Sequence, residues 1–146
     1  MSSKNVTLKL NDVNLCNFKE RVCSEVIVYL KPISYLGDLD PVSGLLKDVG
    51  SISGRILVYP GAVGSTVGSY ILYGLRTNNV SPLALITWNL DPVTIIGAIL
   101  AQIPLCTLRD VKEIFSMLRN REGSVFRFRG CLEDRVLYIE GEVNSI

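Results

Sequence analysis

Between residues 55 and 118 the sequence alternates between short apolar runs and segments of helical length. Residues 55–59, 83–88 and 104–108 predict strands, and the run LALITW at 83–88 predicts a strand that is buried on both faces. A segment with a helix start signal follows each of them. Strands that alternate with helices in this way form a parallel sheet with right-handed crossovers. The sequence therefore predicts an α/β fold with a short parallel βαβαβ core.

The first two helices of this core have different start signals. A glycine- and serine-rich loop after residue 59 leads into a helix that we expect at residues 66–76. The second helix starts at Asp91, a predicted N-cap, with Pro92 at its first position. The body of this helix, VTIIGAILA, is apolar all round, so we expect it to lie deep inside the protein.

The segments on either side of this core predict further strands and one more helix. Residues 6–10 and 25–30 are weakly alternating or β-rich and predict strands before the core. Asp110 and Glu113 form a capping-box-like pair that opens a third helix, which Gly123 ends. The tail segments SVFRFRG and RVLYIEGEV alternate with period two and predict two strands joined through CLED. These flanking strands make the predicted sheet a mixed one.

Length and composition predict one domain over residues 1–146, because 146 residues that are 48% hydrophobic can build one core. We expect that core at about residues 25–108, with the C-terminal helix and two strands at 110–143. The net charge of +1 gives no basic footprint for nucleic acid. The polar N-terminus lacks the apolar segment of a signal peptide, and the longest apolar run, residues 93–106, is too short to span a bilayer. We therefore expect a cytoplasmic protein without nucleic-acid or membrane partners.

The counts of cysteine and histidine restrict the chemistry. Cys16, Cys23, Cys106 and Cys131 form no C-x-x-C pair, and the chain has no histidine. Zinc or iron–sulfur sites built by this chain alone are therefore not expected, and the cysteines are interpreted as buried free thiols. Without histidine, Ser-His-Asp and Cys-His catalysis are also excluded, so acid–base chemistry must use other side chains.

The loop within VYPGAVGSTVGSYIL, residues 58–72, has several possible roles. It fits neither the P-loop pattern nor G-x-G-x-x-G, which argues against a nucleotide site but leaves a small anion open. Ser65 follows Gly64 where the helix should begin, and residue type alone favours a plain N-cap. The same amides and helix dipole would also stabilise an alkoxide, so the position suits a serine that acts as a base. The residues alone leave both roles open.

Three motifs in one order carry a resemblance to a known family. They are LGDLDPVSG at residues 36–44, GRILVYPGAVGSTVGS at 54–69 and DPVTIIGAILAQIP at 91–104. Over residues 25–108 the chain resembles the small, swivelling domain of the aconitase X family. The resemblance implies a swivelling β/β/α domain of the aconitase type with a mixed sheet. The loop departs from the family pattern at Thr66, which replaces a serine, and at Val67, which replaces a threonine.

The resemblance also implies a function. Because this chain is short and separate, it is similar to the small subunits of archaeal hydro-lyases. These enzymes dehydrate (R)-5-phosphomevalonate to trans-anhydromevalonate 5-phosphate in a mevalonate pathway. In such an enzyme a large subunit would hold an iron–sulfur cluster, this chain would hold no cofactor or metal, and Ser65 would be the proton acceptor. The partners implied are that large subunit, in a heterodimer or larger assembly, and a small phosphorylated hydroxy acid.

The expected substrate contacts lie in two segments of the sequence. These residues are Gly64, Thr66, Gly68 and Ser69 in the glycine-rich loop, and Gly37, Asp38 and Asp40 in the turn-rich segment before it. Two alternatives stay open. One is the small subunit of another aconitase X type enzyme, such as a hydroxyproline dehydratase, and the other is a non-catalytic anion-binding interaction module in which Ser65 is only a cap.

Overall fold

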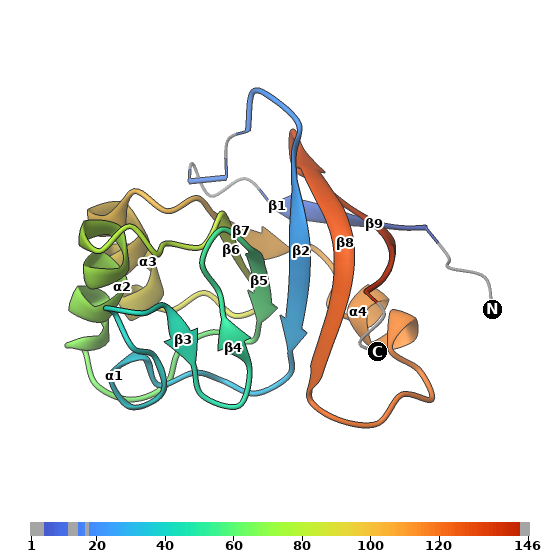
Figure 1. The fold of residues 1–146 in the computed structure, drawn as a ribbon. Coiled ribbons are helices and arrows are strands. Elements are labelled where there is room, and N and C mark those ends of the chain that lie inside the picture. Colours follow the sequence, from blue (N-terminus) through green and yellow to red (C-terminus); the bar gives the residue numbers. More distant parts are fainter. Residues whose placement is uncertain (1–4, 12–14, 17, 144–146) are drawn as a thin grey trace.

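Seven strands form a closed barrel in a computed structural model that describes residues 5–11, 15–16 and 18–143 (Figure 1). Their order around the barrel is β1-β7-β6-β5-β2-β8-β9. The barrel closes because β1 pairs with β7 on one side and with β9 on the other. The strands are β1 Val6–Asn11, β2 Val22–Tyr29, β5 Ile56–Tyr59, β6 Ala84–Thr87, β7 Leu105–Leu108, β8 Val125–Glu133 and β9 Val136–Glu142.

The parallel part of the barrel confirms the predicted α/β core. Strands β2, β5, β6 and β7 are parallel neighbours, whereas β8 pairs with β2 in the antiparallel direction. Helix α2, Gly68–Thr77, connects β5 to β6, and helix α3, Pro92–Ala101, connects β6 to β7. The two helices lie side by side against one side of the barrel (Figure 1). The fold is thus a mixed α/β sheet built on a parallel βαβαβ core.

Alternation along the strands produces two apolar cores. One set of side chains, with Val26, Val58 and Ile86 among them, fills the barrel interior. The neighbouring set, with Ile27, Leu57 and Leu85, packs outward under the helices. All four residues of β6 are buried, which confirms the prediction of a strand covered on both faces.

Four short elements complete the described part of the chain. Helix α1, Tyr35–Asp38, and the two-stranded sheet of β3, Leu45–Leu46, and β4, Gly50–Ser51, lie between β2 and β5. Helix α4, Lys112–Met117, packs buried Ile114 into the barrel core. None of the described helices is long and apolar enough to cross a membrane.

Several element boundaries differ from the predicted ones. Helix α2 starts two residues later than expected, because the amide of Gly68 closes a tight turn on the carbonyl of Ser65 at 3.1 Å. Helix α4 ends at Met117, well before Gly123. Strand β8 continues through most of the predicted CLED connector, since its residues pair with β9 up to Glu133.

The prediction that the apolar helix lies deep inside the protein is wrong. The side chains of Ile96, Ile99 and Leu100 are 52%, 55% and 44% exposed, and only the small residues of α3 are buried. The reason is the architecture, because the helices form a single layer on the barrel. The inner face of α3 is covered by the barrel, and no described segment covers its outer face.

The interpretation of the cysteines as free thiols is also wrong. Cys16 is bonded to Cys106 and Cys23 to Cys131, so no free cysteine remains. The second bond follows from register, because Cys23 on β2 and Cys131 on β8 are direct cross-strand partners. The bonded cysteines are 90 and 108 residues apart in sequence, so no local spacing of cysteines predicts either pair.

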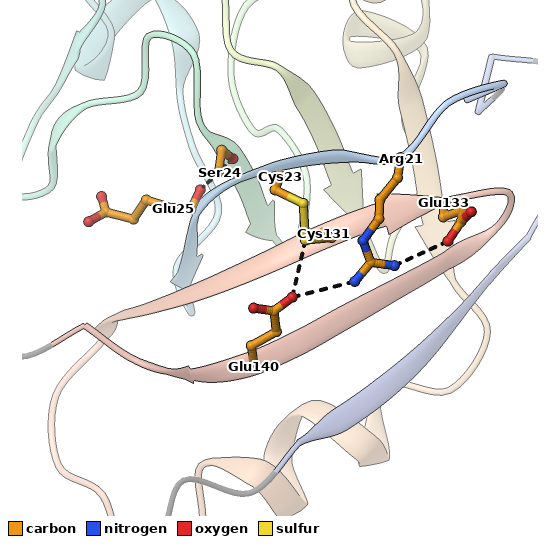
Figure 2. Close-up of a disulfide and its surroundings, with 7 residues drawn as sticks. All are labelled: Arg21, Cys23, Ser24, Glu25, Cys131, Glu133 and Glu140. Atoms are coloured by element: carbon orange, nitrogen blue, oxygen red, sulfur yellow. Dashed lines mark hydrogen bonds and ion pairs between the residues drawn. A yellow bond between two sulfur atoms is a disulfide. The ribbon is translucent and has the colours of Figure 1, made fainter.

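The two disulfides have different surroundings. The Cys16–Cys106 pair is buried in the barrel core, whereas Cys23 is exposed on the outer surface. Figure 2 shows Arg21 beside the Cys23–Cys131 pair, where it makes ion pairs with Glu133 at 3.1 Å and Glu140 at 3.4 Å. The outer disulfide therefore lies under a small polar cluster that solvent reaches.

Candidate functional site

The loop of residues 60–67, which we call the Ser65 loop, carries the chain from the end of β5 to the start of α2. Ser65 is exposed, and its hydroxyl oxygen accepts a hydrogen bond from the amide of Val67 at 3.2 Å. Its carbonyl accepts from the amide of Gly68. Ser65 thus caps the turn before α2 but is not the N-cap of the helix, which is Val67 and has no side-chain cap bond. Its hydroxyl also lies at the positive end of that helix.

A second loop runs beside the Ser65 loop and joins it to α1. The amide of Ile33 donates to the carbonyl of Gly61 at 3.0 Å, and the amide of Val63 donates to the carbonyl of Ile33 at 2.9 Å. Next to them, the Ser34 hydroxyl accepts from the amide of Gly37 at 3.4 Å and caps α1. Backbone pairing therefore holds the two predicted site segments together.

Ser34 is the residue at which these segments meet, and sequence reasoning missed it. Gly64 has a φ of +98°, and a Cβ at this position would lie 3.1 Å from the Ser34 hydroxyl oxygen. Only glycine combines this conformation with so close an approach. Ser34 is a residue type that commonly caps helices, and Asp38 places an acidic residue in the first turn after it, so these two residues are the sequence signal that could have identified Ser34.

Asp91 confirms its predicted role as the N-cap of α3 and also holds the Ser65 loop. One carboxylate oxygen accepts from the amide of Thr94 at 2.8 Å. The other accepts from the Thr94 hydroxyl at 2.8 Å and from the amide of Ala62 at 3.0 Å. The approach is close, because a Cβ at Gly61 would lie 3.2 Å from this second oxygen. One carboxylate therefore fixes the start of a helix and the base of the candidate catalytic loop.

A buried hydroxyl network continues inward from Asp91. The Tyr35 hydroxyl lies 2.5 Å from the Tyr59 hydroxyl and 2.5 Å from the Thr94 hydroxyl. Burial raises the pKa of both tyrosines far above the usual value, so both rings stay neutral. The network ties α1, β5 and α3 together beneath the two loops. It was not foreseen, because its members are far apart in the sequence.

The predicted contacts in the Ser65 loop fall into two groups. Gly64 and Thr66 are exposed beside Ser65. Gly68 packs between α1 and α3, where an added Cβ would meet Tyr35 at 3.1 Å and Val93 at 3.2 Å. Ser69 is buried, and its hydroxyl donates to the carbonyl of Val93 at 2.9 Å. The structure thus brings Gly64, Ser65 and Thr66 to the surface and turns Gly68 and Ser69 inward.

The remaining predicted contacts line a separate hollow of about 470 Å³. Gly37, Asp38 and Asp40 contribute to it together with Lys47. The Asp38 carboxylate accepts from the amide of Ser34 at 3.0 Å. Asp40 accepts from the amide of Val42 and the hydroxyl of Ser43, and these bonds lower the pKa of its carboxyl. The Ser65 loop does not line this hollow, so the candidate site consists of two open patches that meet at Ser34.

The cations near these patches differ in what they contact. Arg55 pairs with Glu25 at 3.1 Å, and Arg76 donates to the side chain of Gln102 at 3.3 Å. Lys47, by contrast, lines the hollow. Among the residues that the structure describes, no group of three or more His, Cys, Asp or Glu side chains could hold a metal ion.

Comparison with known proteins places this geometry in a family. The family model of the aconitase X swivel domain matches residues 15–140. The chain belongs to the aconitase X swivel family. The crystal structure of Thermococcus kodakaraensis aconitase X in its holo form aligns with a TM-score of 0.68 at 33% identity, covering 92% of this chain and 98% of that one. The aconitase-type swivel fold expected from the sequence is therefore confirmed.

Curated relatives of this aconitase X swivel chain carry a more specific name. The phosphomevalonate dehydratase small subunit of Pyrococcus horikoshii is 45% identical over 111 residues, which cover 69% of this chain and 83% of that protein. The protein of the same name from Methanosarcina acetivorans is 35% identical over 112 residues, which cover 73% and 76%.

Proposed function

We propose that this chain is the small subunit of a phosphomevalonate dehydratase, a hydro-lyase that acts only together with its large subunit. The observation that carries the proposal is the identity of 35–45% with proteins of that name. The match to the Pyrococcus protein extends over 83% of that protein, so it involves most of the relative and not a shared fragment. The reaction proposed is dehydration of (R)-5-phosphomevalonate to trans-anhydromevalonate 5-phosphate.

In this proposal Ser65 accepts the proton from the carbon beside the substrate carboxylate. Three observations support that role. Its hydroxyl is exposed, it stands at the positive end of α2, and the amide of Val67 donates to its oxygen. The Asp91 carboxylate and the backbone pairing to Ile33 hold the loop that carries it. Base catalysis also needs a water-poor site, which a partner seated on this open surface would supply.

The residues of this chain do not fit an iron–sulfur cluster, because all four cysteines are paired in disulfides. We therefore assign the cluster to the large subunit and derive no step through it here. The proposal also includes a cytoplasmic location, because a charged, phosphorylated substrate does not cross a bilayer unaided.

The experiment is co-expression of the chain with its large subunit, followed by a dehydratase assay on (R)-5-phosphomevalonate. The complex should turn over this substrate, and each subunit alone should not. Hydroxyproline serves as the competing substrate. Turnover of hydroxyproline without turnover of phosphomevalonate would reassign the chain to another dehydratase of the family. A complex that binds phosphomevalonate without dehydrating it would favour a binding module.

A further inference from the structure

The outer surface of helices α2 and α3 is apolar. Among the 20 residues of the two helices, Arg76 in the last turn of α2 is the one charged side chain. Tyr70 and Tyr73 on α2 are 68% and 45% exposed, and Ile96, Ile99 and Leu100 on α3 are also exposed. Surface helices usually place charged residues on the face turned to water. We call these five side chains the α2–α3 face.

Contacts between the helices show that this face is continuous. Ser69 donates to Val93 near the start of both helices, and Arg76 donates to Gln102 near their ends. Midway between them, a Cβ at Gly97 would lie 2.6 Å from Leu72. Tyr73 follows Leu72 on α2, and Ile96 precedes Gly97 on α3. Both side chains therefore border the line of contact between the two helices on its solvent side.

The α2–α3 face also continues into the Ser65 loop. Val63 and Val67, on either side of Ser65, are 53% and 48% exposed. Apolar side chains therefore extend from the two helices to both sides of Ser65. Neighbouring exposed apolar side chains often mark a site of protein interaction, and tyrosine is enriched at protein interfaces.

We propose that the α2–α3 face is the docking surface for the large subunit, whose contacting surface is apolar and carries few charges. This inference rests on the proposed function, which seats the large subunit over the Ser65 loop. Exposed Val67 and Tyr70 connect that loop to the first turn of α2, so a partner that covers Ser65 and extends along α2 would also contact Tyr73 and Ile96. Docking here would fix α2 and α3, whose N-terminal ends hold the loop in place.

The test is the affinity of the chain for its large subunit, measured by isothermal titration calorimetry. Ile96→Glu and Ile96→Lys each place a charge on the face, and each should raise the Kd by about tenfold or more, because the charge is buried on docking. Phe115→Glu is the matched control. Phe115 is 51% exposed on α4, which lies on the other side of the barrel (Figure 1). This variant should bind within about threefold of wild type, because Phe115 lies outside the proposed interface.

Melting curves by circular dichroism verify that each variant is folded. Wild-type-like affinity of both folded Ile96 variants would overturn the proposal, and so would the absence of a wild-type complex at micromolar concentration. An isolated chain that forms a dimer through this face, with Ile96→Glu dissociating the dimer but not weakening the complex, would assign the face to a second copy. If complex formation depends on Ile96 but phosphomevalonate is not dehydrated, the docking surface stands and the proposed function fails.

Discussion

At the scale of single residues, two oxygen-bearing side chains give the candidate site its shape. Ser65 closes the turn into α2 with its own hydroxyl, and Asp91 fixes the base of the same loop through the amide of Ala62. Ser65 is exposed and makes one side-chain hydrogen bond, while Asp91 is partly buried and accepts three. Replacement of Ser65 should therefore affect turnover more than stability, and replacement of Asp91 should affect stability more than turnover.

Ser65→Ala tests the proposed proton acceptor. In the assembled enzyme this change should lower turnover by about 10²–10⁴-fold while substrate still binds, which is the usual contribution of a positioned base. Loss of the cap alone should cost about 1 kcal/mol of stability. The measurements are steady-state turnover and melting curves for the same preparations.

Two further variants control this experiment. Thr66→Ala removes the neighbouring hydroxyl, an expected substrate contact, so it should raise KM but leave kcat nearly unchanged, because the proposal gives Thr66 no proton transfer. Ser65→Thr keeps a hydroxyl but adds a methyl group in a tight loop, so its activity should be low. A Ser65→Ala enzyme within about threefold of wild-type turnover would reduce Ser65 to a cap, since loss of a base costs far more.

Asp91→Ala should destabilise the chain by about 2–4 kcal/mol, because it removes an N-cap and leaves the amide of Ala62 without its partner. Asp110→Ala is the control, since the Asp110 carboxylate accepts one hydrogen bond, from the amide of Lys112, just before Val111, the N-cap of α4, which has no side-chain cap bond of its own. That change should cost only about 1 kcal/mol. Urea unfolding of both variants gives the comparison, and equal losses would show that the bond to Ala62 contributes nothing.

At the scale of elements, local signals predicted what local forces determine. The sequence predicted the Asp91–Pro92 start of α3, the alternating tail strands and the parallel order of β5, β6 and β7. These features were predictable because capping and periodicity act within a few residues. The exposure of Ile96 and the pairing of Cys23 with Cys131 were not, because they depend on which distant segments become neighbours. For the same reason the sequence indicated Ser65 by motif but gave no sign of the Tyr35–Tyr59–Thr94 network.

The packing of α2 against α3 depends on one close approach. Gly97→Ala adds a Cβ that would lie 2.6 Å from a methyl carbon of Leu72, which is fully buried. The change should cost about 1–2 kcal/mol, because overpacking outweighs the better helix propensity of alanine. Leu72→Ala should cost about 2–5 kcal/mol by itself.

A double-mutant cycle of these two positions separates the contributions. The double variant should be more stable than the sum of the single effects predicts, by about 0.5–3 kcal/mol, because the added methyl group occupies the space that Leu72 leaves. If the losses in free energy of unfolding were strictly additive in urea, residues 72 and 97 would have no energetic coupling across the α2–α3 contact.

At the scale of the whole molecule, the disulfides tie distant parts of the chain to the barrel. Cys23–Cys131 is partly solvent-exposed and Cys16–Cys106 is buried, so a mild thiol reductant should open the outer pair first. Alkylation followed by mass spectrometry should show a species with two modified cysteines before one with four. Simultaneous opening of both pairs would mean that reduction requires global unfolding. Removal of the outer pair by Cys23→Ser with Cys131→Ser should cost about 2–4 kcal/mol.

Each of the seven described barrel strands has a hydrogen-bonded neighbour on both sides. In an open sheet the outermost strands present unpaired amides and carbonyls, which another chain can use to extend the sheet and which often seed aggregation. The barrel strands present no such row, so a partner cannot join them by strand addition. A partner that docks on the barrel or its helices therefore meets side chains, where a single substitution can change the choice of partner while the strand pairing stays intact.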